Sequence, residues 1–203
     1  EEYAAELCSD PQMIEKAYAG GVPMGSELEA FAASPTFLVS AAKDAGSRGH
    51  PGLDLQRIQV IKGWLDDAGQ THEQVFDVAG NADNGAGVDP NSCRPTGSGH
   101  KNLCAVWQDP HYDDSEPAFY YVRVLENPSC RWSTLHCQAA GVNPFAPNCA
   151  EQAATKTERM KDNGAIGDVY GKCCLDSSQQ PFYSPTLQER AWTSPIWMNP
   201  RKT

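Results

Sequence analysis

The chain has 203 residues, enough for one domain with an apolar core or for one domain with a smaller appendage. Its formal net charge of -10 argues against a nucleic-acid partner, because phosphate recognition depends on an excess of Lys and Arg. No apolar run approaches the roughly 20 residues that cross a bilayer. An acidic chain suits an extracellular protein and a divalent-cation-binding protein equally well.

Eight cysteines are many for this length, and none of them forms a CxxC pair. The spacings of zinc ribbons and thioredoxins are therefore absent, and we expect four disulfides in an oxidising compartment, either the periplasm or the extracellular space. Because the chain opens without a basic and then apolar segment, we expect a removed leader or a start inside a longer gene product. The cysteines are Cys8, Cys93, Cys104, Cys130, Cys137, Cys149, Cys173 and Cys174.

Geometry limits the disulfide pairing without deciding it. Cys130 and Cys137 are expected on one helix, about 10 Å apart, which is too far for a bond between them. Cys173 and Cys174 are adjacent in the chain and are expected to take separate partners.

The first part of the chain predicts a short helix followed by strands. Asp10 and Pro11 begin the helix as N-cap acceptor and first helical residue, and glycines end it at residues 20 and 21. Residues 36–43 read as a strand. Residues 55–64 and 72–79 read as two strands that pair as a hairpin.

Residues 80–99 are rich in Gly, Asn and Asp, and a loop of this length is unusual unless it is functional, flexible or tied down. Cys93 and Cys104 flank a Gly-rich turn, so they are the favoured single disulfide.

Carboxylate and amide oxygens suit Ca²⁺, which makes calcium the candidate cofactor. EF-hand spacing is absent, and a solvated loop is the alternative. The candidate ligands are Asn81, Asp83, Asn84 and Asp89 in this loop and Asp113, Asp114 and Glu116 in a second acidic cluster.

Residues 118–125, AFYYVRVL, form the densest apolar and aromatic run. Both of its alternating faces are largely apolar, which predicts a central strand covered on both sides. Pro128 ends this strand. A second run, residues 187–198, contains Pro195 and therefore predicts a strand at an edge or with a bulge, with Trp192, Ile196 and Trp197 giving a large apolar contact area.

Asn127 and Pro128 also begin a predicted helix that ends near Ala140 and carries Trp132 and Leu135 on its apolar side. Beyond it the apolar periodicity fades, and a polar stretch at residues 151–162 reads as a short helix.

These elements predict a mainly β (α+β) chain with a few short helices. The predicted core is an antiparallel β-sandwich-like domain formed by residues 1–142 together with 185–203. Residues 143–184 are predicted to form a loop-rich surface insertion held by disulfides.

Several polar residues are candidates for a site or for structural pairs. His72, Glu73 and Asp77 lie on one predicted strand and form a candidate polar site, with solvated side chains as the alternative. Charged residues beside the two aromatic runs are interpreted as ion pairs that join them, namely Glu126, Arg131, Glu189 and Arg190. The five tryptophans read as core or as a sugar-stacking platform. Motifs for a nucleophilic serine, a phosphate loop or a dinucleotide are absent from the sequence.

Four long motifs follow one another along nearly the whole chain. They are AYAGGVPMG at 17–25, LQRIQVIKGWLDDAGQTHEQVFDVA at 55–79, AFYYVRVLENPSCRWST at 118–134 and LQERAWTSPIWM at 187–198. In this order they resemble the C-terminal half of a large bacterial family, the domain-of-unknown-function family numbered 3604. Ser26-Glu27 departs from the family's common Gly-Asp, and the cysteine-rich insertion after Gly141 is longer than the family pattern.

The resemblance implies a function for the whole protein. Full-length members carry an N-terminal part with a His-x-His motif, similar to polymerase-and-histidinol-phosphatase (PHP) metallohydrolases. His-x-His does not occur in this sequence, so the resemblance implies a non-catalytic C-terminal portion whose partner is an N-terminal metallohydrolase portion. The alternative is a stand-alone extracellular binding or assembly module for a glycan, calcium or a protein.

Overall fold

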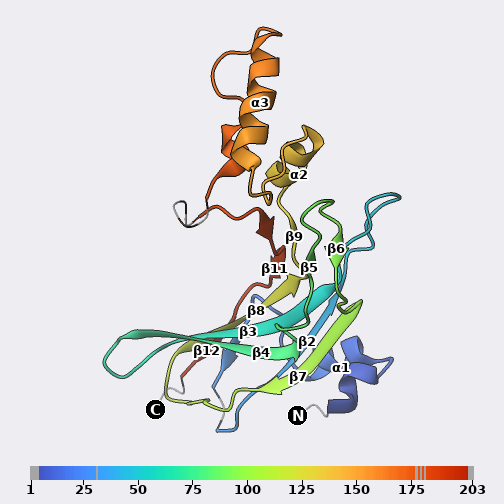
Figure 1. The fold of residues 1–203 in the computed structure, drawn as a ribbon. Helices are drawn as coiled ribbons and strands as arrows, with labels where there is room; N and C mark the ends of the chain where they lie inside the picture. Colours follow the sequence, from blue (N-terminus) through green and yellow to red (C-terminus); the bar gives the residue numbers. More distant parts are fainter. Residues whose placement is uncertain (1–4, 31, 177, 179, 181, 201–203) are drawn as a thin grey trace. The chain divides into compact units, whose positions relative to one another are not determined.

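The computed structural model describes residues 5–30, 32–176, 178, 180 and 182–200 (Figure 1). Its contacts divide the chain into two compact units. The first comprises Glu1–Asn84, Gly99–Glu126 and Arg190–Thr203, and the second comprises Gly85–Ser98 and Asn127–Glu189. The predicted insertion, residues 143–184, lies within the second unit.

The first unit is built on a six-stranded sheet in which β8 is central. β3 pairs with one edge of β8, while β11 and β12 pair in succession with the other edge. All these pairings are antiparallel, and β1 adds to β12 in parallel. The strands are β1 (Glu27–Glu29), β3 (Leu55–Leu65), β4 (Thr71–Gly80), β8 (Ala118–Glu126), β11 (Arg190–Trp192) and β12 (Ile196–Asn199). The predicted central position of residues 118–125 is confirmed.

The hairpin between β3 and β4 is closed by local turn chemistry. The Asp66 carboxylate accepts hydrogen bonds from the backbone amides of Ala68 and Gln70, at 2.9 and 2.8 Å. Gly69 has φ +74°, a conformation that glycine adopts without a steric penalty. The predicted hairpin is therefore confirmed, and its register places Trp64 opposite His72.

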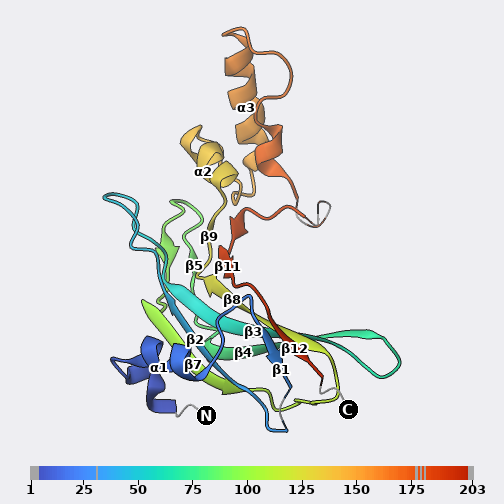
Figure 2. The same cartoon turned by 180° about the vertical axis from the view of Figure 1, so that it is seen from behind.

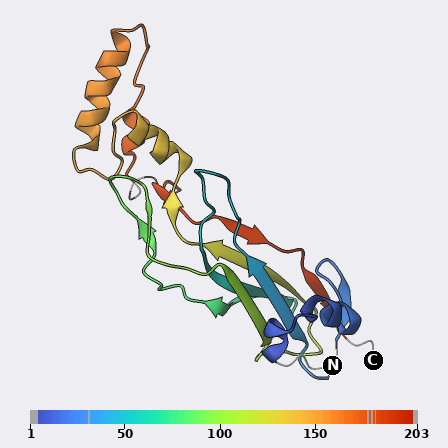
Figure 3. The same cartoon turned by 90° about the vertical axis from the view of Figure 1, so that its right-hand side faces the viewer.

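A second layer covers one face of this sheet (Figures 2 and 3). β2 (Thr36–Ala42) and β7 (Asn102–Gln108) form an antiparallel pair whose apolar side chains enter the main core. The Phe37 ring lies 4.7 Å from the Tyr120 ring, centroid to centroid. The 3-10 helix η1 (Ala5–Ser9) lies against β7 and leads to α1 (Met13–Gly20). The prediction of a mainly β chain with a few short helices is confirmed.

Among its described residues, the second unit holds two α-helices and two short strand pairs. α2 (Trp132–Ala139) and α3 (Cys149–Lys161) are each bonded to the 3-10 turn η2 (Gly171–Cys174) by a disulfide. A small buried cluster accompanies these bonds and consists of Val142, Cys149, Ala153 and Cys173. The strand pairs are β5 (Gly87–Val88) with β6 (Pro95–Thr96) and β9 (Ser129–Cys130) with β10 (Thr186–Leu187).

All eight cysteines form the four disulfides that were expected. The bonds are Cys8–Cys104, Cys93–Cys130, Cys137–Cys173 and Cys149–Cys174. Consecutive Cys173 and Cys174 take separate partners, as predicted.

The favoured pair of Cys93 with Cys104 is wrong, because these two residues belong to different units. Cys104 lies on β7 and reaches Cys8 of η1, whereas Cys93 lies in a turn with φ +54° and reaches Cys130 of β9. Cys130 precedes the helix, which begins at Trp132.

Several large apolar side chains are exposed. Trp132 and Leu135 of α2 are 70% and 49% exposed, so the predicted apolar side of this helix is open to solvent. Trp192 and Trp197 are 59% and 47% exposed, because their side chains point to the sheet face that the β2–β7 pair does not cover. In the described part of the chain, no helix has both the length and the apolar character needed to span a bilayer.

Candidate functional site

The main sheet presents two chemically different faces, since neighbouring side chains on a strand alternate. The face toward β2 and β7 is an apolar core that includes Ile58, Val60 and Tyr120. We define the outer face as the opposite side of the sheet. Its side chains are Glu73, Val75 and Asp77 of β4, Gln59, Ile61 and Gly63 of β3, Phe119, Tyr121 and Arg123 of β8, and Trp192 and Trp197 of β11 and β12.

A buried ionic cluster lies on the core side of the sheet. The Lys62 ammonium contacts the Asp109 carboxylate at 2.7 Å and donates to the carbonyl oxygen of His111 at 2.6 Å. The Tyr120 hydroxyl donates to the same Asp109 oxygen at 2.7 Å. The side chains of Lys62 and Asp109 are 3% and 0% exposed. This cluster holds the loop after β7 against the centre of the sheet.

The cluster shifts two pKa values in opposite directions. Burial alone would raise the pKa of Asp109, but hydrogen bonds from Lys62, from Tyr120 and from the backbone amide of His111 outweigh burial and hold it below 3.8. Burial and the adjacent Asp109 carboxylate raise the pKa of the Tyr120 hydroxyl. These hydrogen bonds favour an ionised Asp109 and a protonated Tyr120, a combination that stabilises the buried cluster.

A polar row crosses the outer face. The Arg123 guanidinium donates from Nε to Oε1 of Gln59 at 2.8 Å, and the Gln59 amide donates to Oδ1 of Asp77 at 2.7 Å. Arg57 approaches the same Asp77 oxygen at 3.3 Å. The register extends this row from Arg123 to Trp192 of β11. The side chains are held in place by one another, which gives a preorganised polar surface beside an exposed tryptophan.

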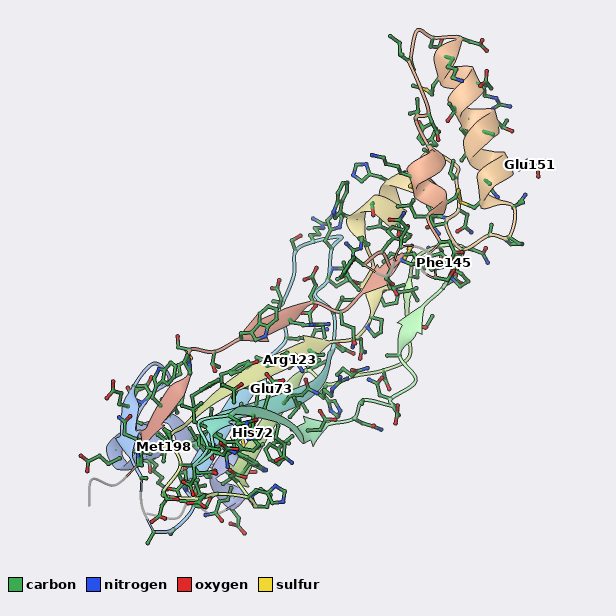
Figure 4. The ribbon with its side chains drawn as sticks, turned by 90° about the vertical axis from the view of Figure 1, so that its left-hand side faces the viewer. His72, Glu73, Arg123, Phe145, Glu151 and Met198 are labelled. Carbon is green, nitrogen blue, oxygen red and sulfur yellow. A yellow bond between two sulfur atoms is a disulfide. The ribbon has the colours of Figure 1, made fainter. Side chains whose placement is uncertain are left out.

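An aromatic groove of about 520 Å³ lies at one end of the sheet, and we call it the β12 groove. Phe119, Trp197 and Gly63 line it on the outer face, together with Glu73 and Asn199. Figure 4 shows Glu73, Arg123 and Met198 on the main sheet.

The predicted polar site is not assembled as expected. His72 lies on the opposite side of β4 from Glu73 and Asp77, where its ring stacks on Trp64 with centroids 5.1 Å apart. Its Nε2 atom contacts the Asp66 carboxylate at 2.8 Å. Hydrogen bonding from His72 lowers the pKa of Asp66. Glu73 faces the β12 groove, and Asp77 belongs to the polar row.

The predicted calcium ligands are mostly acceptors for nearby backbone amides. Asn81 accepts from the amide of Asp83, Asp89 accepts from the amides of residues 91 and 92, and Asp113 accepts from the amide and hydroxyl of Ser115. Asn84 accepts from the Gln56 amide at 3.4 Å. Asn81, Asp83 and Asn84 lie in the first unit and Asp89 lies in the second.

Within the described residues, no group of three or more His, Cys, Asp or Glu side chains has the arrangement of a metal site. Asp114 and Glu116 remain partly exposed in the loop before β8. Calcium binding stays a prediction.

The four residues proposed as ion pairs have different surroundings. Arg131 donates from Nε to the carbonyl oxygen of Ser184 at 3.0 Å. Glu126 ends β8, and Arg190 begins β11 opposite Leu125. Glu189 is exposed at the end of the second unit. Their role as ion pairs that join the aromatic runs stays a prediction.

Sequence reasoning missed the buried pair of Lys62 with Asp109. One signal was present, since Lys62 is the one polar side chain between Val60 and Trp64. A lysine on the core side of a central strand requires a buried acceptor. The sequence did not show that Asp109 would be that acceptor.

Comparison with known families decides the relationship. The family model described as protein of unknown function (DUF3604) matches residues 1–160. The chain belongs to the DUF3604 family. No match was found among curated proteins or among solved structures. The DUF3604 match covers the first unit up to the end of β8 and extends into α3 of the second unit.

Proposed function

We propose that this chain is the non-catalytic, β-rich C-terminal portion of a secreted or periplasmic, PHP-like metal-dependent hydrolase. In this proposal the part of the outer face around Arg123 and Trp192 contacts the catalytic portion, which supplies the metal ligands. Membership of the DUF3604 family supports the relationship, and four disulfides support an oxidising compartment.

The polar row beside Trp192 is the observation that carries the proposal. Arg123, Gln59 and Asp77 are already ordered by hydrogen bonds, so a partner would lose little side-chain entropy on contact. Trp192 is 59% exposed beside them. Tryptophan and arginine are the residues most enriched at the energetic centres of protein interfaces.

Co-purification tests this assignment. The chain is mixed with the His-x-His-containing N-terminal portion of a full-length DUF3604 protein, and complex formation is measured by size-exclusion chromatography. We expect a complex that the double substitution Arg123→Ala and Trp192→Ala weakens at least tenfold. Trp132→Ala is the matched control, because Trp132 is an exposed tryptophan of the other unit.

A hydrolysis assay completes the test. The chain alone, supplied with Mn²⁺ or Zn²⁺, is expected to leave phosphoester substrates intact. Metal-dependent hydrolysis by the purified chain, or a complex insensitive to the outer-face substitutions, would refute the proposal.

The second candidate function is a stand-alone extracellular binding module. The β12 groove favours it, since Trp197 is 47% exposed and lies 5.2 Å from Phe119, centroid to centroid. Isolation of the native chain as a stable monomer without an N-terminal fragment, together with ligand binding that Trp197→Ala abolishes, is the result expected for this function.

A further inference from the structure

One row of side chains crosses five strands of the outer face. The strand register places Glu73 opposite Gly63, Gly63 opposite Phe119, Phe119 opposite Trp197, and Trp197 opposite Glu27. The row therefore has a carboxylate at each end and an aromatic surface between them. Strands in a sheet are roughly 4.8 Å apart, so the two ends lie about 19 Å from each other along the row.

The glycine in this row shapes the aromatic surface. A Cβ atom at position 63 would lie 2.3 Å from the Phe119 ring, so only glycine lets this ring lie over the β3 backbone. The Phe119 ring also lies 5.2 Å from the Trp197 ring and 6.3 Å from the Tyr121 ring, centroid to centroid. The rings of Phe119, Trp197 and Tyr121 therefore form one continuous aromatic surface.

The charged side chains at the two ends of the row are both acidic. Glu73 lines the β12 groove, and Glu27 lies at the far end of the row, where its carboxylate accepts a hydrogen bond from Asn199 at 3.1 Å. Among the described residues that line the groove, none is Lys or Arg. Carboxylates and the negative faces of aromatic rings both attract cations, so an anionic ligand is disfavoured here.

We propose that the β12 groove binds a linear polyamine, an alkyl chain with an ammonium group at each end. The terminal ammonium groups contact Glu73 and Glu27, and the methylene segments lie over Phe119 and Trp197. Extended spermine is of similar length to the row, whereas 1,4-diaminobutane is much shorter. This inference depends on the row itself and not on the proposed hydrolase relationship.

The linear arrangement distinguishes this ligand class from others. A single ammonium ion would use one carboxylate, and a compact sugar ring would cover one aromatic side chain and leave the distant carboxylate without a role. An extended ligand charged at both ends matches both the separation of the carboxylates and the aromatic surface between them.

Calorimetric titration of the full chain with spermine, spermidine and 1,4-diaminobutane tests the proposal. We expect affinity to fall in that order. Glu73→Gln and Glu27→Gln are each expected to weaken spermine binding about two- to fivefold, as for exposed ion pairs. Trp197→Ala is expected to weaken it to a similar extent through loss of cation–π and apolar contact.

Binding of the shortest amine, 1,4-diaminobutane, tests whether the ligand spans both carboxylates. Because 1,4-diaminobutane cannot span the row, substitution at one end should leave the other end available to it. The loss of binding affinity caused by Glu27→Gln is therefore expected to be larger for spermine than for 1,4-diaminobutane.

Glu151→Gln is the matched control for charge, since Glu151 is an exposed glutamate of α3 in the second unit (Figure 4). It should change spermine affinity by less than about 1.5-fold, because distant exposed charges are screened by salt. Equal losses in Glu151→Gln and Glu73→Gln would indicate general attraction to an acidic protein and overturn the proposal. Unchanged spermine affinity in Trp197→Ala, or tighter binding of an uncharged oligosaccharide at the same groove, would also overturn it.

Discussion

Replacement of Lys62 by Met is expected to unfold the first unit more readily than any surface substitution. The methionine fills a similar volume but removes the ammonium that contacts Asp109 at 2.7 Å. Asp109 is fully buried, so its carboxylate would lose its cation without gaining water. The substitution also removes the hydrogen bond to the carbonyl oxygen of His111.

The expected loss of unfolding free energy follows from the burial of the Asp109 carboxylate. Breaking a buried ion pair by removing one partner costs about 3–5 kcal/mol, because the remaining charge is uncompensated. The additional substitution Asp109→Asn removes that charge and keeps an acceptor for the Tyr120 hydroxyl. The double variant is therefore expected to be more stable than Lys62→Met alone, by about 1–3 kcal/mol.

Urea denaturation with the disulfides intact measures the free energies of unfolding of Lys62→Met and of the double variant. A loss below about 1 kcal/mol in Lys62→Met, the level of an exposed pair, would refute the reasoning. So would strictly additive effects in the double variant, since residues in direct contact should show coupling.

The pH dependence provides an independent check. The folded-state pKa of Asp109 is below 3.8, so its contribution to stability is present above its unfolded pKa and is lost as pH falls through the folded value. In Lys62→Met, burial without the cation raises the pKa of Asp109, and protonation relieves the penalty. The difference in stability between wild type and Lys62→Met should therefore begin to narrow above pH ~4, where the raised pKa lets Asp109 protonate in the folded variant, and should narrow further below pH ~4, where wild type loses its own contribution.

Three further stability predictions concern the first unit, each measured by urea denaturation. Gly63→Ala should cost about 1–3 kcal/mol, because the added methyl group displaces the Phe119 ring. Replacing Cys8 and Cys104 by Ala should cost about 4 kcal/mol, since their bond closes a loop with a sequence separation of 96. Tyr120→Phe should cost about 1.5–3 kcal/mol, because a hydrogen bond to a buried carboxylate is lost.

Matched variants control these predictions. Gly87→Ala meets nothing closer than 3.6 Å and should be nearly neutral. Tyr121→Phe, on the outer face, should change stability by less than about 0.5 kcal/mol. Equal effects of Tyr120→Phe and Tyr121→Phe would contradict the role given to the Asp109 hydrogen bond.

The strands could be predicted because their signals are local. Alternating and continuous apolar runs identified the segments that became β2, β3, β4 and β8, and turn chemistry identified the β3–β4 hairpin. The central position of β8 followed from its two apolar faces. These signals depend on a few neighbouring residues, so tertiary contacts had little opportunity to override them.

Pairings between distant segments could not be predicted in the same way. The partner of Cys104 depends on how η1 folds back onto β7, and the partner of Lys62 depends on where the chain passes after β7. The exposure of Trp132 likewise depends on which elements pack on α2. Composition gives no information on such packing.

The row from Glu73 to Glu27 shows the same limit for the candidate site. Its members come from five strands, and they form a line only when every register is known. A shift of one residue in β3 would place Lys62 on the outer face and Gly63 in the core. The aromatic groove therefore arises from the registers of the whole sheet.

Cys173 and Cys174 fasten both helices of the second unit to one short turn. Two of the four buried residues in that unit's apolar cluster are themselves half-cystines, so the same sulfur atoms provide both the tether and part of the packing. A thiol reductant would remove both contributions at once. Whether α2 and α3 stay together is then governed by the redox potential of the surroundings, whereas the broad apolar core of the main sheet responds chiefly to heat and denaturant.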